Sequence, residues 1–480
     1  MLLWLAETFS VTWIYDIIFI AYIVTIVSII VIVVSENRNP VKTLAWVTVL
    51  LLLPVFGAIL YLFFGRNIQN TFKLSRRNRR RLKKSEPDPH ADYKSMDFSL
   101  ESLQEIRLGN GLTGSHFYPG NEVEIYCDGE HKFRQLLADL KKAKRYINIQ
   151  YYIFANDRIG REVADILIER ALAGVKVRVI YDHVGSWSTP NKFFKRMKAA
   201  GIEVYPFFKV TFAWLGSRVN WRNHRKLCVI DGKTGYIGGM NIADRYIDGG
   251  KEFKCWRDTH LRVRGPIVAA LQYSFAFDWH QMGQPLITDT IDTHAIRGNV
   301  GAQLITSGPT SRWDSLAFMF HKAICSANKR VYIQTPYFLP TDALLKALMI
   351  AALGHIDVRI MIPRKCDSKL LNFASASYIS QCLQAGIKFY FYEPGMLHAK
   401  MLIIDDDIAS VGSTNFDFRS FEHNFEGNLF FYSPDFVSKT IEIFREDLKD
   451  CTRVNAAQWK KRPLWRRGIE SIVRLLGPIL

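Results

Sequence analysis

The stretch His224-Arg-Lys-Leu-Cys-Val-Ile-Asp231, followed by Gly238-Gly-Met-Asn241, occurs in two copies in the chain. The second copy is His398-Ala-Lys-Met-Leu-Ile-Ile-Asp405, followed by Gly412-Ser-Thr-Asn415. Both copies have the form H-x-K-x4-D-x6-G-[GS]-x-N. A single H-x-K arises by chance, but a pattern of polar and glycine positions that recurs at identical spacing indicates a duplicated structural unit.

Three pairs of strand-type segments repeat around these motifs. They are residues 147–154 with 331–338, 175–180 with 356–361, and 201–205 with 386–390. Segments with helical periodicity, such as 161–173 and 342–353, lie between the strands. Alternating strands and helices predict an α/β fold in which helices cover a sheet. We therefore expect two tandem α/β halves, residues 118–285 and 295–450.

The motif residues predict chemistry on a phosphodiester. Residues two apart in a strand share a face, so the His and Lys of each copy point the same way. These pairs are His224 with Lys226 and His398 with Lys400. A neutral imidazole can attack phosphorus, and a protonated one can donate to the leaving group. The lysines and the two motif asparagines would supply positive charge and N–H donors to the phosphate.

The phosphate-binding candidates among the asparagines are Asn241 and Asn415. The sequence contains no Walker loop, acidic magnesium cluster or H-E-x-x-H motif. A lysine beside each histidine also disfavours a bound cation. We therefore expect metal-free chemistry without a cofactor.

A nucleophilic histidine needs a carboxylate that fixes its tautomer. The motif residues Asp231 and Asp405 are catalytic candidates by position, but they fall on the strand face opposite the histidines. We expect them to serve structure, through polar pairing at a strand end. Further alignment of the halves matches Asp258 with Glu426 as the orienting carboxylates. Glu252 is the alternative, because it follows the first histidine by 28 residues, as Glu426 follows the second.

Two long apolar runs precede the repeat. Residues 17–34 and 43–65 contain no charged side chain, and each is close to the roughly 20 residues that cross a bilayer as a helix. The eight residues between them form a tight turn. The sequence therefore predicts a transmembrane hairpin within residues 1–65, with spans at about 13–34 and 43–64. A cleaved signal peptide is disfavoured, because the first twelve residues contain an acid and no Lys or Arg.

The formal charge of +18 is concentrated in two segments. Residues 66–84 carry nine cations and no acid, and residues 451–480 carry seven cations and one acid. Such segments beside apolar runs are typical of attraction to anionic lipid, and the nearly neutral remainder argues against nucleic acid as a partner. The positive-inside rule places the C-terminal body in the cytoplasm. The cysteines are scattered along the chain and odd in number, which also favours this reducing compartment. We predict that residues 66–117 form a basic linker.

The paired motifs resemble the phospholipase D superfamily, whose mark is a doubled H-x-K-x4-D, and more closely the bacterial cardiolipin synthases. The resemblance extends to the N-terminal segments Asn39-Pro40, Thr43-Leu-Ala-Trp46 and Tyr61-Leu-Phe-Phe-Gly65. It implies two phospholipase D-like α-β-α sandwich halves with pseudo-two-fold symmetry, which meet at one active site.

The same resemblance implies a membrane-bound enzyme that converts two phosphatidylglycerols into cardiolipin and glycerol through a phosphatidyl-histidine intermediate. By analogy, His224 would be the nucleophile and His398 the general acid and base. A phosphatidylserine synthase or a hydrolytic phospholipase D would share every catalytic residue. A membrane-anchored nuclease would need a basic groove on the body, and a non-catalytic scaffold is hard to reconcile with two intact motifs.

Two further segments are candidates for lipid contact. The apolar aromatic loop 210–221 has no counterpart in the second half, and it either meets the membrane or packs between domains. The basic tail, residues 451–480, resembles an interfacial amphipathic helix. A docked or solvated terminal helix is the alternative for that tail.

Overall fold

The computed structural model describes residues 2–35, 40–61, 98–209, 221–289, 291, 298–475 and 477. They divide into two compact units: the N-terminal residues 2–35 and 40–61, and a body formed by the rest. Loop 210–220, residues 62–65 at the end of the predicted hairpin and residues 66–97 of the predicted linker lie outside the described residues.

The N-terminal unit contains the helices α1 (Leu2–Ser35), α2 (Pro40–Leu52) and α3 (Pro54–Leu60). Among the described residues, one helical stretch, Tyr15–Ser35 of α1, is long and apolar enough to cross a membrane. Its large apolar side chains are mostly exposed in the isolated chain. This stretch agrees with the first predicted span.

The second predicted span, 43–64, is not one helix. Proline lacks an amide hydrogen and its ring crowds the preceding turn, so α2 ends at Leu52 and α3 begins at Pro54. Neither helix approaches the roughly 20 residues that a bilayer requires. Val33, Leu50 and Tyr61 nevertheless form a small buried cluster, so α1 and α2 pack together. The two-span hairpin stays a prediction.

The first half of the body runs from β1 to α10. Its strands are β1 (Phe117–Tyr126), β2 (Tyr146–Tyr151), β3 (Lys176–Asp182), β4 (Glu203–Phe207), β5 (Arg222–Asn223), β6 (Leu227–Ile230), β7 (Thr234–Gly238), β8 (Trp256–Arg257) and β9 (His260–Arg264). Its helices are α6 (Gly129–Lys141), α7 (Arg158–Leu172), α8 (Asn191–Ala199), α9 (Arg245–Asp248) and α10 (Val268–Gln281). The parallel strands β2, β3 and β4 need crossover connections, which α7 and α8 supply.

The second half runs from β10 to α17. Its strands are β10 (Val300–Ser307), β11 (Arg330–Gln334), β12 (Phe338–Leu339), β13 (Asp357–Pro363), β14 (Lys388–Tyr392), β15 (Met396–Leu397), β16 (Met401–Ile404), β17 (Ile408–Gly412), β18 (Phe416–Asp417), β19 (Asn424–Phe431) and β20 (Cys451–Arg453). Its helices are α11 (Ser315–Cys325), α12 (Asp342–Leu353), α13 (Lys369–Gln384), α14 (Phe418–Glu422), α15 (Pro434–Lys449), α16 (Ala456–Lys460) and α17 (Leu464–Leu475). Each half has its own buried apolar core.

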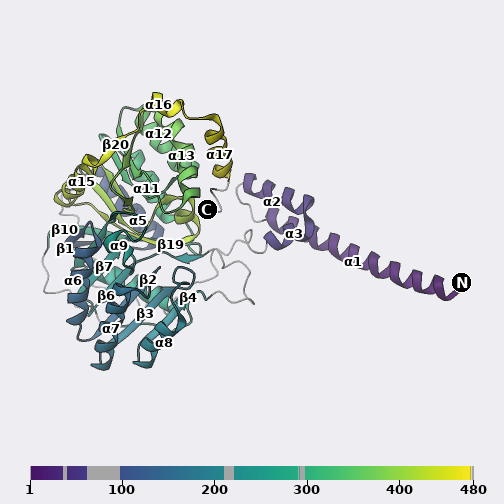
Figure 1. The fold of residues 1–480 in the computed structure, drawn as a ribbon, viewed down its shortest axis with the longest axis horizontal. Coiled ribbons are helices and arrows are strands. Elements are labelled where there is room, and N and C mark those ends of the chain that lie inside the picture. The colour runs from purple at the N-terminus through teal and green to yellow at the C-terminus, as the bar shows by residue number, and fades with distance from the viewer. Residues whose placement is uncertain are drawn as a thin grey trace. The chain divides into compact units, whose positions relative to one another are not determined.

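One mixed sheet of 16 strands joins the two halves. Outward from β1 the strand order is β9-β7-β6-β2-β3-β4, and outward from β10 it is β19-β17-β16-β11-β13-β14. Each of these strands therefore has a counterpart at the same place in the other half, and β20 is an addition beside β14. Strands β1 and β10 pair antiparallel at the centre, and Figure 1 shows the blue first half and the green to yellow second half meeting there. The predicted α/β duplication is therefore present as one continuous sheet.

Helix α5 (Leu100–Thr113) lies inside the segment that the sequence analysis assigned to a linker. Ser99 caps the helix by accepting a hydrogen bond from the amide of Ser102, and Ile106 is buried in the core of the second half. The linker prediction is wrong for these residues. The Gly109-Asn-Gly111 run lowers helix propensity, so the stability of α5 comes from packing that the local pattern did not reveal.

Candidate active site

Two short strand pairs carry the motif histidines from one half to the other. Strand β5 pairs in parallel with the start of β19, and β15 pairs in parallel with β8. The amide of His224 donates to the carbonyl oxygen of Phe425 at 2.9 Å, and that of His398 donates to Arg257 at 2.6 Å. The residue after each acceptor is a carboxylate, so each histidine lies beside an acid of the opposite half.

These carboxylates hold the histidine rings. His224 Nδ1 lies 2.8 Å from Glu426 Oε1, and His398 Nδ1 lies 2.6 Å from Asp258 Oδ2. Both acids are completely buried. Glu252, the alternative orienting residue, is exposed in the turn before β8. The structure thus brings Asp258 and Glu426 to the histidines and leaves Glu252 outside the site.

Burial sets the charge of the two imidazoles. It lowers the pKa of His224 to about 4, partly opposed by Glu426, and burial together with Lys400 lowers the pKa of His398 to about 4. Both rings are therefore neutral near pH 7 in the free protein. His398 Nδ1 lies 2.6 Å from Lys400 Nζ as well as from Asp258 Oδ2, so the carboxylate alone does not set the tautomer of that ring. Because a carboxylate only accepts hydrogen bonds, the Nδ1 of His224 carries the hydrogen and its Nε2 keeps a lone pair. That tautomer suits a nucleophile.

The motif lysines bind the backbone of the motif histidines. Lys226 Nζ donates to the carbonyl oxygen of its own motif histidine at 2.6 Å, and Lys400 Nζ donates to the corresponding carbonyl of His398. Both side chains are buried. Burial lowers the pKa of Lys226, and it lowers that of Lys400 to about 8. Lys400 Nζ also lies 4.0 Å from Asp258 Oδ2, so Lys400 offsets part of the charge of that carboxylate.

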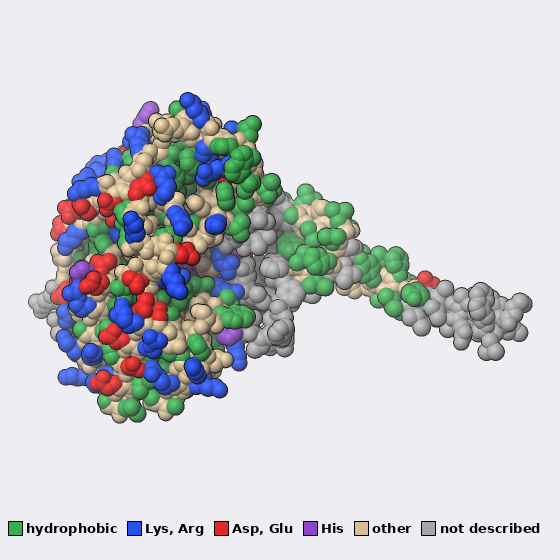
Figure 2. Space-filling view, viewed as in Figure 1, with side chains coloured by type: hydrophobic (Ala, Val, Ile, Leu, Met, Phe, Trp, Pro, Cys, Tyr) green, Lys and Arg blue, Asp and Glu red, His purple; other side chains and the backbone are tan. Residues whose placement is uncertain are grey.

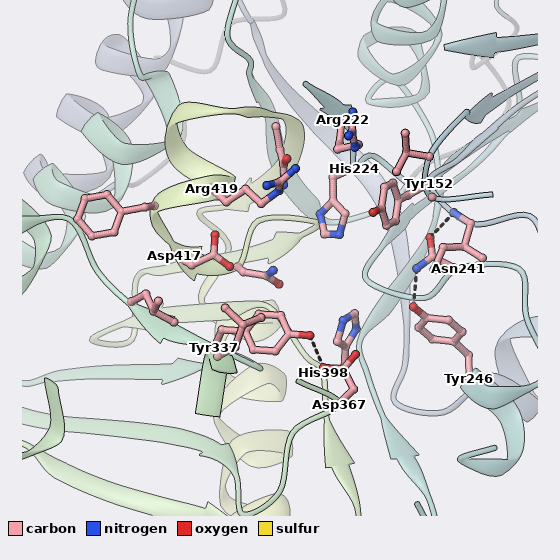
Figure 3. Close-up of a pocket in the computed structure, with 18 of the residues that line it drawn as sticks. Tyr152, Arg222, His224, Asn241, Tyr246, Tyr337, Asp367, His398, Asp417 and Arg419 are labelled. Carbon is pink, nitrogen blue, oxygen red and sulfur yellow. Dashed lines mark hydrogen bonds between the residues drawn. The ribbon is translucent and has the colours of Figure 1, made fainter. Parts of the chain in front are cut away.

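Both histidines line one cavity of about 330 Å³. Figure 3 shows their rings turned toward the same space, one from each half. Asn241 and Asn415 also line it. The Asn241 amide is engaged, because its oxygen accepts from the amide of Ile153 and its nitrogen donates to a tyrosine hydroxyl. The side-chain oxygen of Asn415 has no partner among the described residues.

Comparison with known proteins supplies the family. Residues 136–279 and 320–448 match the family described as cardiolipin synthase, PLD-like domain, and residues 20–66 match the phospholipase D-nuclease N-terminal family. Cardiolipin synthase 2 of Bacillus cereus is 41% identical over 459 residues, which cover 93% of this chain and 88% of that protein. The chain belongs to the cardiolipin synthase family.

A second relative agrees with this assignment, and a solved structure shares the fold. The major cardiolipin synthase ClsA of Bacillus subtilis is 40% identical over 479 residues, which cover 96% of this chain and 98% of that protein. The crystal structure of phosphatidylserine synthase from Haemophilus influenzae aligns with a TM-score of 0.60 at 12% identity, covering 78% of this chain and 100% of that one. At that identity the likeness shows the fold alone.

Three arginines that the sequence analysis missed line the cavity of this cardiolipin synthase family member: Arg222, Arg245 and Arg419. Arg245 and Arg419 each follow the motif asparagine by four residues, so extending the repeat would have found them. Arg222 has no such signal, since its matched position in the second half is Met396. The cavity lining also includes Asp367 and Asp417, so the arginines outnumber these acids by one.

The motif aspartates perform matched structural tasks outside the cavity. The Asp231 carboxylate accepts hydrogen bonds from the backbone amides of residues 144, 145 and 146 at 2.7–2.9 Å. Asp405 does the same for residues 328, 329 and 330, each at 2.7 Å. Both aspartates have positive φ, 54° and 51°, at the turn after β6 and β16. They tie each motif strand to the start of β2 or β11.

We expect Asp231→Ala to destabilise the fold by about 1–3 kcal/mol, because three amides lose their acceptor and alanine tolerates the positive φ poorly. Turnover per folded molecule should stay within about twofold of wild type, since the side chain does not reach the cavity. Thermal unfolding of the purified protein and its specific activity measure both effects. A loss of about 100-fold in turnover with an unchanged melting temperature would instead assign Asp231 to the chemistry.

Gly239 leaves room for the first orienting carboxylate. A Cβ atom at this position would lie 2.0 Å from Asp258 Oδ1, and the backbone amide of Gly239 is already bound to the carbonyl of Thr259. The matched position in the second half is Ser413, whose hydroxyl donates to Glu426. The second residue of the G-[GS] pair therefore matches the acid that it faces: Gly239 leaves room for Asp258, and Ser413 binds Glu426.

We expect Gly239→Ala to lower kcat by about 10- to 100-fold, because Asp258 must shift and His398 loses its alignment. Gly111→Ala is the matched control, since an added Cβ there meets nothing within 4 Å. Steady-state kinetics on both variants provide the comparison. Wild-type kcat in Gly239→Ala would show that the contact between Asp258 and His398 does not support turnover.

Proposed function

We propose that this protein is a cardiolipin synthase that transfers a phosphatidyl group from one phosphatidylglycerol to another and releases glycerol. The observation that carries the proposal is the pair of histidines on one cavity, each with Nδ1 held by a buried carboxylate and Nε2 left for the substrate. A displacement repeated on one phosphorus atom needs two such groups. The similarity to proteins named cardiolipin synthase supports the choice of lipid.

The first half-reaction forms a phosphatidyl-histidine. The neutral Nε2 of His224 attacks phosphorus, the bond from phosphorus to the glycerol oxygen breaks, and His398 donates its Nε2 proton to that oxygen. His398 must take up this proton first, because its pKa is about 4 in the free protein. A bound phosphodiester places negative charge beside the ring and raises that pKa, so substrate binding favours the acid form.

The second half-reaction restores the enzyme. His398, now neutral, removes the proton from a hydroxyl of the second phosphatidylglycerol, whose oxygen attacks the phosphorus. The bond between phosphorus and His224 Nε2 then breaks, which releases cardiolipin and leaves His398 protonated for the next cycle. The three arginines neutralise the charge that develops on the phosphate oxygens.

The cavity and the anchor suit a substrate that stays in the membrane. A space of about 330 Å³ holds a headgroup but not two acyl chains, so the chains remain outside it. The apolar stretch of α1 would keep the enzyme on the surface that contains its lipid. The cations of residues 66–84 would place the body on the cytoplasmic side, against the anionic leaflet.

Product analysis tests the proposal. Purified protein is incubated with phosphatidylglycerol vesicles, and the products are resolved by mass. We expect cardiolipin and glycerol in equal amounts. Phosphatidic acid as the main product would indicate a hydrolytic phospholipase D. If phosphatidylserine forms, and only after addition of serine and a cytidine diphosphate lipid, the protein is a phosphatidylserine synthase.

A further inference from the structure

The C-terminal helix α17 is fixed to the body along one face. Val473 is buried in the core of the second half. Glu470 is also buried and pairs with Arg462 at 2.6 Å and with Arg466 at 3.4 Å. The Arg474 guanidinium lies 4.3 Å from the centre of the Tyr378 ring on α13. These contacts make α17 a docked part of the body, with a defined inner and outer face.

The outer face of α17 is apolar and unusually exposed. It presents Leu464, Trp465, Ile472 and Leu475, whose surfaces are 80%, 67%, 65% and 78% exposed. Figure 2 shows hydrophobic side chains gathered where Figure 1 places α17. Single exposed apolar residues are ordinary on protein surfaces, but a contiguous group on one helix marks a contact site. We call these four residues the tail face.

The charge around the tail face selects an anionic partner. Four exposed cations lie on or just before α17: Lys460, Lys461, Arg466 and Arg467. The one acid between residues 451 and 480, Glu470, is buried and already paired. A helix with large apolar side chains on one side and arginine beside them is typical of binding within the headgroup region of an anionic bilayer.

The C-terminal end of α17 leads to the cavity that holds the two histidines. Gly477, two residues beyond α17, lines that cavity. Leu371 of α13, the helix on which α17 packs, and Leu339 line it as well. The end of α17 and the helix that supports it therefore both contribute to the cavity wall, within the same half of the body.

We propose that the tail face inserts into the interface of an anionic bilayer and holds the mouth of the cavity against the lipid surface. The occupant is the bilayer itself. The contact is made by the body and does not require α1. Its consequence for turnover rests on the proposed function, since it would let a lipid headgroup reach the histidines while its acyl chains stay in the membrane.

Hydrogen exchange of the full-length protein tests the contact without any reference to activity. The protein is compared in detergent micelles, in phosphatidylcholine nanodiscs and in nanodiscs that contain phosphatidylglycerol. We expect the amides of residues 464–475 to exchange about fivefold more slowly in the phosphatidylglycerol nanodiscs, while the exposed end of α7 near Leu172 stays unchanged. Equal exchange in all three would overturn the proposal. Protection that instead follows protein concentration in detergent would also overturn it, by identifying a second copy as the occupant.

A substitution experiment tests the consequence. The variant Leu464→Gln, Trp465→Gln, Ile472→Gln and Leu475→Gln leaves the inner contacts of α17 in place. We expect about tenfold lower turnover on phosphatidylglycerol in bilayers and unchanged turnover on a monomeric short-chain phosphatidylglycerol. The control carries Leu172→Gln and Ile350→Gln, two equally exposed apolar positions on α7 and α12. Equal losses on both substrates, or a matching loss in the control, would contradict the proposal. If no variant or wild-type protein acts on phosphatidylglycerol, the proposed function fails, and hydrogen exchange alone decides the bilayer contact.

Discussion

His224→Ala is expected to lower phosphatidyl transfer on the order of 10⁴-fold, and His398→Ala is expected to do the same. Each substitution removes a group that the reaction needs at phosphorus, the nucleophile in one case and the acid and base in the other. The melting temperature should change little, because both rings reach the cavity surface. Initial rates of cardiolipin formation from phosphatidylglycerol provide the measurement.

The double variant distinguishes a shared reaction from two separate contributions. Groups that act as a unit are strongly non-additive, so His224→Ala with His398→Ala should be no slower than either single variant. More than a tenth of wild-type turnover in either single variant would contradict a mechanism that uses both rings. Loss of activity in both single variants would also reject the non-catalytic scaffold.

The second large effect is expected at the orienting carboxylates. Glu426→Gln and Asp258→Asn should each lower kcat by about 10²- to 10⁴-fold with a small change in KM, because an amide can hold the ring in the wrong tautomer. The affected histidine lies in the opposite half in both cases. Steady-state kinetics of the two variants, together with their melting temperatures, measure these effects.

Glu252→Gln is the matched control, because this exposed carboxylate lies in the turn before β8. Its turnover should equal that of the wild type. The conservative variant Glu426→Asp should recover part of the activity lost in Glu426→Gln, since it keeps a charged acceptor. Intact turnover in Asp258→Asn combined with loss in Glu252→Gln would reverse the assignment of the orienting residue.

The repeat made much of the fold predictable. The spacing of the motifs predicted the duplication, and the strand and helix periodicity of the local sequence predicted the α/β character. The exchange of carboxylates between halves was not predictable, because it depends on the pairing of β5 with β19 and of β15 with β8. Strands β5, β8 and β15 are two residues long and leave no periodic signal.

Three other differences between the predictions and the structure have identifiable causes. Pro54 divides an apolar run whose composition alone predicts a continuous span. Helix α5 contains two glycines and an asparagine near its end, so its stability depends on contacts with distant residues such as Gln303. The cavity arginines were missed because the motif was compared only as far as the asparagine, although Arg245 and Arg419 continue the same repeat.

Trapping the covalent intermediate tests whether His224 forms a phosphatidyl-histidine. His398→Asn protein lacks both the acid for the first step and the base for the second, so it is incubated with a phosphatidyl ester of p-nitrophenol labelled at phosphorus, whose leaving group departs without an acid. The mixture is quenched at alkaline pH, where a phosphorus–nitrogen bond to histidine persists. We expect one label per chain on the peptide that contains His224, and no label in His224→Ala. A label on another residue, or steady cardiolipin formation by the wild type with no labelled protein at any time, would contradict a phosphatidyl-histidine at His224.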